Sequence, residues 1–109
     1  MAQQHTRSGE CVSVLPLREH LAQTRTTAII KAEQLEVVRI VLMADKEMRE
    51  HSAPGEITVL CIEGEIVFRT PSSEQTLVAG DFVHLGRGVP HALRAVLDSS
   101  ALLTICLAS

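Results

Sequence analysis

Short apolar runs separated by polar turn residues make up most of the chain after residue 25. The runs are rich in valine, isoleucine and threonine, β-branched residues that suit a pleated sheet. The longest run, residues 35–43, has an apolar spacing that a helix could also produce, but β-branched residues at four of its nine positions favour a strand. The predicted strands cover residues 26–31, 35–43, 56–62, 65–70, 74–78, 82–85, 90–96 and 101–107.

Turn residues mark the connections between these strands. The segment 45–47 is predicted to turn out of the strand at 35–43. The segment 63–64 is predicted to join two neighbouring strands as a tight hairpin, in which Gly64 supplies the positive φ. Short strands at close, even spacing are typical of a sandwich or barrel, so we predict an all-β domain.

Residues 1–25 are more polar than the rest of the chain. Pro16 suits the first position of a helix, and Leu17 and Leu21 fall on one helical face. One short helix is therefore predicted before the sheet. The expected organisation is an N-terminal arm with this helix over residues 1–25 and a single β-barrel domain over residues 26–109.

The core expected inside this domain is aliphatic. Apolar residues make up 46% of the chain, yet only two residues are aromatic. The predicted interior residues are Ile57, Val59, Ile66, Phe68, Phe82, Leu93 and Leu103. A net charge of −3 and the scarcity of aromatic side chains argue against a nucleic-acid partner, which needs a basic face and stacking surfaces.

Cysteine usage and hydropathy bear on the location of the protein. The three cysteines form neither a C-x-x-C pair nor an even disulfide framework, which favours a reducing compartment. No segment approaches the roughly 20 apolar residues that span a bilayer, and the first residues lack an apolar run of signal-peptide length. We expect a cytoplasmic protein with no membrane partner.

Two segments carry histidine, glycine and proline at a characteristic spacing, and both resemble the signature motifs of the cupin superfamily. The first motif, G-x5-H-x-H-x3-E-x6-G, falls on Asp45, His51, Ala53, Ile57 and Gly64. The second motif, G-x5-P-x-G-x2-H-x3-N, falls on Gly80, Gly86, Gly88, His91 and Ala95. The chain looks most similar to small single-domain, RmlC-like cupins. The resemblance implies a jelly-roll barrel, also called a double-stranded β-helix.

The same resemblance implies a metal site, but most of its ligands are missing here. In small cupins two histidines and a glutamate of the first motif and the histidine of the second hold a divalent metal inside the barrel. Only His51 and His91 match. Positions 51, 53 and 57 share parity and would line one face of an extended segment, so Ala53 and Ile57 put apolar groups where donors should be. Two imidazoles alone make a weak site, since zinc and iron sites usually use more protein ligands.

Three nearby residues could supply a third ligand, although each also has a simpler structural role. Glu56 would point inward only if a β-bulge at residues 54–55 reset the alternation, and is otherwise a solvated charge. Cys61 shares parity with His51 and is otherwise core filler. His84 lies on a neighbouring strand and is otherwise a surface or hydrogen-bonded histidine. The structural roles are preferred, so we expect no bound divalent metal, with a metal completed by one of these residues as the alternative.

The preferred functional hypothesis is a protein that holds a small apolar or weakly acidic molecule at the barrel mouth, in contact with His51 and His91. Two alternatives stay open. One is a metal-dependent cupin enzyme of dioxygenase, isomerase or decarboxylase type with a non-standard ligand set, and the other is a structural or interaction module whose own side chains fill the pocket. The sequence contains no nucleophile elbow, phosphate-binding loop or zinc-protease helix motif. Small cupins often pair through edge strands, and a short apolar chain has such edges to cover, so a homodimer is expected.

Overall fold

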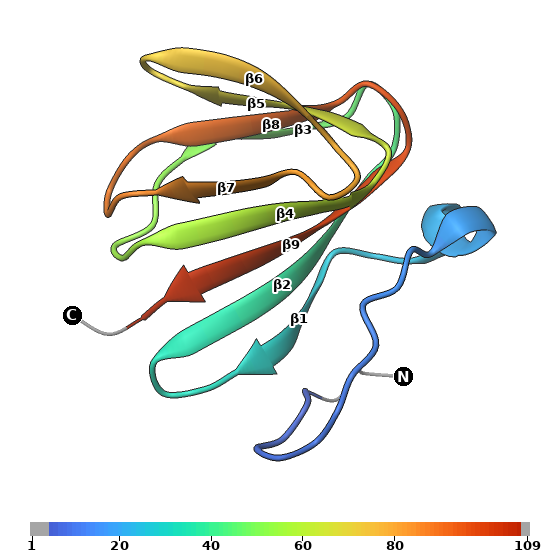
Figure 1. Cartoon of the computed structure of the whole chain (residues 1–109), viewed down its shortest axis with the longest axis vertical. Helices are drawn as coiled ribbons and strands as arrows, with labels where there is room; N and C mark the ends of the chain where they lie inside the picture. The colour runs from blue at the N-terminus through green and yellow to red at the C-terminus, as the bar shows by residue number, and fades with distance from the viewer. Residues whose placement is uncertain (1–4, 108–109) are drawn as a thin grey trace.

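The computed structural model describes residues 5–107, which form nine strands in two antiparallel sheets. The elements are the 3-10 helix η1 (Arg18–Gln23) and the strands β1 (Thr27–Lys31), β2 (Leu35–Leu42), β3 (Glu47–His51), β4 (Ile57–Glu63), β5 (Glu65–Thr70), β6 (Ser73–Val78), β7 (Phe82–Leu85), β8 (His91–Ala95) and β9 (Ser99–Cys106). The strand order is β1-β2-β9-β4-β7 in the five-stranded sheet and β3-β8-β5-β6 in the four-stranded sheet. In Figure 1 the four-stranded sheet lies above the five-stranded sheet, and the N-terminal arm runs beside the latter.

The predicted all-β architecture is confirmed, but one strand was not predicted. The segment 35–43, which could have fitted a helix, forms β2 and pairs along its length with β9. The unpredicted strand is β3, which begins where a turn was expected. Only Met48 of this strand packs against the core, and its other side chains are exposed, so it has no apolar run to reveal it. The turn spans residues 44–45, so it includes Asp45 as predicted, and this residue has a φ of 70°.

The predicted hairpin at residues 63–64 is wrong, because β4 and β5 belong to different sheets. The chain crosses from one sheet to the other at Gly64, which has a φ of 89°. A Cβ atom at this position would collide with the Ser99 side chain and the Asp98 carbonyl. Glycine is therefore required here by both its backbone conformation and its lack of a side chain.

The core lies between the sheets and is aliphatic, as predicted, apart from Phe68 and Cys61. The buried residues that were predicted are Ile57, Val59, Ile66, Phe68, Leu93 and Leu103. Phe82 was also predicted to be inside, but its side chain is 65% exposed. It lies opposite Leu60 on β4, whereas its neighbour Val83 packs against the core. Alternation along β7 therefore turns Phe82 to the outer face of the five-stranded sheet.

The N-terminal arm contains the predicted short helix, but it is a 3-10 helix that begins at Arg18 rather than at Pro16. Leu21 is its buried residue. The arm packs on the outer face of the five-stranded sheet, where the Arg39 side chain of β2 donates a hydrogen bond to the Leu15 carbonyl at 3.0 Å. No helix within residues 5–107 is long and apolar enough to cross a membrane.

The carboxylate of Glu63, at the end of β4, holds the arm in place. The backbone N–H groups of Leu17 and Arg18 donate to its two oxygens at 2.8 and 2.9 Å, and the Ser100 hydroxyl donates to one of them as well. Burial raises the pKa of Glu63, but these three hydrogen bonds and the nearby charge of Arg39 outweigh it and leave the pKa below its ordinary value. Glu63 therefore binds the arm as a carboxylate.

Candidate functional site

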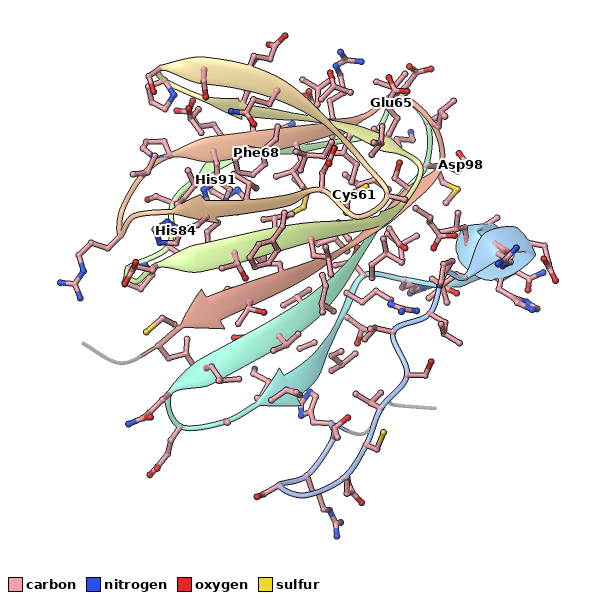
Figure 2. All side chains as sticks on the ribbon, in the orientation of Figure 1. Cys61, Glu65, Phe68, His84, His91 and Asp98 are labelled. Atoms are coloured by element: carbon pink, nitrogen blue, oxygen red, sulfur yellow. The ribbon has the colours of Figure 1, made fainter. Side chains whose placement is uncertain are left out.

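His91 is fixed in the interior at the start of β8. It is 3% exposed and shares the inner face of the strand with Leu93 and Ala95. The Phe68 ring of β5 stacks against the imidazole, with ring centroids 6.0 Å apart and an angle of 17° between the planes. Figure 2 labels both side chains on their neighbouring strands. One face of the His91 ring is therefore covered by an apolar aromatic wall.

His51 is brought to His91 by the pairing of β3 with β8. The two residues are directly opposite each other in the register, and such residues in an antiparallel pair point to the same face of a sheet. Their ring centroids are 4.3 Å apart, and the planes are tilted by 59°. His51 is exposed, so the pair joins a buried imidazole to one at the surface. The two motif histidines thus lie side by side, at the end of β3 and the start of β8.

Backbone hydrogen bonds fix the tautomer of both rings. His51 Nδ1 lies 2.8 Å from the Arg49 carbonyl oxygen, and His91 Nδ1 lies 3.1 Å from the Val89 carbonyl oxygen. A carbonyl can only accept, so each neutral ring carries its proton on Nδ1 and a lone pair on Nε2. The pair therefore offers two neighbouring nitrogen acceptors.

The environment of His91 favours its neutral form. Burial lowers its pKa, the hydrogen bond to the Val89 carbonyl raises it, and the nearby His51 ring lowers it further. The net effect is a pKa below the ordinary histidine value, since a charged imidazolium is poorly solvated in this position. His91 is consequently a neutral imidazole with an available Nε2 at pH 7.

The three proposed third ligands do not reach the histidine pair. Glu56 is exposed and accepts a hydrogen bond from His84, whose Nε2 lies 2.7 Å from Glu56 Oε1. His84 lies opposite Thr58, so both belong to the outer face of the five-stranded sheet. Cys61 is fully buried in the core, where burial raises the pKa of its thiol and disfavours the thiolate that binds metals. The structure thus places Glu56 and His84 in a hydrogen-bonded surface pair and Cys61 in the core.

Residues 51, 53 and 57 were predicted to share one face because they were placed on one extended strand. That reason is wrong, because no single strand contains all three residues. β3 ends at His51, residues 52–56 form a connection, and β4 begins at Ile57. The β-bulge that would have turned Glu56 inward is absent from this described segment, in which Gly55 instead packs against the backbone of Cys106. Ala53 and Ile57 still pack on the core, so the positions of the missing donors are apolar.

The residues present do not fit a usual divalent-metal site. Within residues 5–107 no group of three histidine, cysteine, aspartate or glutamate side chains is placed to hold a metal. The histidine pair supplies two donors, whereas structural sites use four protein ligands and catalytic sites usually three. The chemistry of the pair is therefore that of two hydrogen-bond acceptors beside an aromatic wall.

Sequence reasoning missed two features of this region. Phe68 was predicted only as a core residue, although it stacks on His91. The Glu56–His84 hydrogen bond was not predicted, because it depends on the register between β4 and β7. Neither feature leaves a signal in the residue spacing.

Comparison with known proteins identifies the fold of this region. A family model described as a cupin domain matches residues 38–107. A conserved protein of unknown function from Streptococcus pyogenes aligns with a TM-score of 0.78 and 22% identity over 100% of this chain and 99% of its own. A cupin superfamily protein from Desulfitobacterium hafniense aligns with a TM-score of 0.77 and 11% identity, covering 99% and 100%. An RmlC-like cupin protein from Desulfovibrio desulfuricans aligns with a TM-score of 0.69 and 23% identity, over 94% of this chain and 97% of its own. No curated protein matches the sequence.

Proposed function

The chain belongs to the cupin family, and we propose that it binds a small apolar or weakly acidic molecule through His51 and His91 at the mouth of its barrel. The observation that carries this proposal is the geometry of the pair. The rings are 4.3 Å apart, and both Nδ1 atoms are engaged by backbone carbonyls, which leaves both Nε2 lone pairs for a ligand.

Two adjacent acceptors suit a ligand that carries a hydroxyl or carboxylic acid proton. One Nε2 accepts that proton or its hydrogen bond, and the other accepts a second donor or a bridging water. The lowered pKa of His91, which burial causes, keeps this ring an acceptor at neutral pH. The buried Phe68 ring stacks on the His91 imidazole and helps to fix its orientation.

A direct test is an NMR titration with benzoic acid and phenol as probes, which follows the side-chain nitrogens of ¹⁵N-labelled histidine. We expect the Nε2 signals of His51 and His91 to shift on binding, and the variants His51→Ala and His91→Phe to bind at least 10-fold more weakly. His84→Ala is the matched control and should bind as the wild type does, because His84 lies on the outer face of its sheet.

The other two hypotheses predict different outcomes of the same experiment. A metal-dependent enzyme would retain about one divalent metal per chain in native mass spectrometry and would lose it on His51→Ala. A structural module with a filled pocket would bind neither probe, and the histidine signals would not move. An equal loss of binding in His84→Ala would also argue against a site at the histidine pair.

We further propose that the protein is a homodimer. Support comes from the edge strand β7, where Phe82 is 65% exposed and lies beside Leu60 on the same outer face. Large exposed aromatic side chains on a strand edge favour association. Light scattering after size exclusion should give twice the chain mass for the wild type and the mass of one chain for Phe82→Glu. A cytoplasmic location, for which the pattern of cysteines is the support, is part of the same proposal.

A further inference from the structure

A groove runs across the outer face of the five-stranded sheet, on the opposite side of the sheet from the core. Its volume is about 460 Å³, within the range of small-molecule sites. Its apolar surface comes from Leu35 and the neighbouring Cys106, and its polar groups include Glu56, Thr58, His84 and Thr104. Figure 2 labels His84 on β7, at one side of this face.

The polar groups form a row across three strands. Thr58 of β4 is directly opposite His84 of β7 on one side and Thr104 of β9 on the other. Residues opposite each other point to the same face, so the imidazole and the two hydroxyls lie side by side. Glu56, just before β4, closes one end of the row through its hydrogen bond to His84 Nε2. The groove therefore has an ordered polar rim beside an apolar surface.

Among its described lining residues, the groove offers an acidic group to a ligand and no lysine or arginine. The acidic group is one carboxylate, Glu56. His84 engages only the Oε1 atom of this carboxylate among the described residues, so Oε2 can accept a further hydrogen bond. With Nε2–H directed at Glu56, the neutral imidazole has its lone pair on Nδ1, which is a second acceptor. An anion would meet the Glu56 charge without a compensating cation.

We propose that this groove is a second binding site, distinct from the histidine pair, for a small molecule with an ammonium or other cationic nitrogen group and an apolar body. The cation pairs with the second oxygen of Glu56, the threonine hydroxyls orient polar atoms of the ligand, and the apolar body lies on Leu35 and Cys106. Glu56 and His84 are 64% and 57% exposed, so solvent weakens the charge pair and the affinity is in the micromolar to millimolar range.

The test uses three probes of nearly equal size that differ in charge: 2-phenylethylammonium, phenylacetate and 2-phenylethanol. Backbone amide shifts are followed in ¹H–¹⁵N spectra of the whole chain. We expect the ammonium probe to shift the amides of Thr58, His84 and Thr104 with a dissociation constant below about 5 mM, and the alcohol and the carboxylate to bind at least 10-fold more weakly.

Glu56→Gln should weaken binding of the ammonium probe at least 10-fold without changing the thermal unfolding temperature. The matched control is Glu74→Gln, which removes an exposed carboxylate from β6 in the other sheet and should leave binding unchanged. Equal binding of phenylacetate, or unchanged binding in Glu56→Gln, would overturn the proposal. So would amide shifts at His51 and His91 instead of the groove. If the protein is a dimer and the ammonium probe shifts none of the groove amides, the groove is covered by the second copy of the chain. That result would also overturn the proposal.

Discussion

Replacing Glu63 with glutamine should release the N-terminal arm from the five-stranded sheet. The carboxylate accepts the Leu17 N–H on one oxygen and the Arg18 N–H on the other, at 2.8 and 2.9 Å. Glutamine has only one side-chain oxygen, so its NH₂ group would face one of these donors. Glu63→Gln therefore removes a charge-assisted hydrogen bond and opposes a donor to a donor.

The size of the effect follows from the hydrogen bond that is lost. A hydrogen bond to a charged group contributes about 1.5–3 kcal/mol. Arg18 also has a φ of 53°, in the left-handed region. That conformation costs about 1–2 kcal/mol, and the strain favours opening once the bond is gone. We expect the free energy of arm opening to fall by about 1.5–3 kcal/mol, which raises the open population roughly 10- to 150-fold.

Limited proteolysis with trypsin measures this population. Arg18 and Arg25 lie in the arm and are exposed, and their cleavage tracks the open form when the arm closes faster than the protease cuts. Glu65→Gln is the matched control, because it removes the same charge two residues away without touching the arm. Cleavage at both arginines should be 10- to 150-fold faster in Glu63→Gln than in Glu65→Gln, by the same conversion.

The same contact should respond to acid. Burial raises the pKa of Glu63, but the hydrogen bonds from Ser100, Leu17 and Arg18 lower it below its ordinary value. The released arm therefore binds the proton more readily than the attached arm, so attachment is complete above a pH of about 4.5 and weakens as the pH falls below it. With an acid-tolerant protease such as pepsin, the wild type should become more sensitive below this pH, and Glu63→Gln should not. Equal cleavage of Glu63→Gln and Glu65→Gln would refute the reasoning.

Three further predictions concern the core and the histidine pair. Because burial lowers the pKa of His91, the free energy of unfolding should decrease as the pH falls below the ordinary value of 6.5, and His91→Phe should remove this dependence in urea titrations from pH 8 to 5. Gly64→Ala should destabilise by about 2–4 kcal/mol, since a collision adds to the strain. Gly80 has a φ of 92° but open space around it, so Gly80→Ala should lower the free energy of unfolding by only about 1–2 kcal/mol. Equal losses for Gly64→Ala and Gly80→Ala would contradict the collision at Gly64. In urea unfolding, Phe68→Ala should lower the free energy of unfolding by about 3–5 kcal/mol. Leu97 is 55% exposed, so Leu97→Ala should lower it by less than about 0.5 kcal/mol. Similar losses for the two variants would contradict the assigned core.

Most of the fold could be predicted because most strands are β-branched runs between turn residues. The prediction failed where a strand carries charge instead, since β3 has only Met48 packed on the core. It also failed at Gly64, where a positive φ is equally compatible with a hairpin and with a crossing between sheets. Local sequence sets the turn, but packing between the two sheets decides where the next strand pairs.

The candidate site was predictable only in part, for a related reason. The motif spacing was enough to bring His51 and His91 together, because each histidine lies on a strand of the same pair. The orientation of Glu56 could not be counted from His51, since alternation holds only within one strand and residues 52–56 form a connection. Phe82 was misplaced because its apolar character outweighed the alternation of β7 in the prediction.

The two histidines of the pair differ in how firmly they are held, and this has a consequence for regulation. His91 belongs to β8, which has a strand on each side, whereas His51 ends β3, an edge strand with one neighbour. His51 therefore lies on a strand with fewer neighbours than the strand of His91. A strand or another protein that paired with the free edge of β3 would contact the strand of His51 and not that of His91. If the pair binds a ligand as proposed, residues on the outer edge of β3 would influence its affinity without touching the ligand.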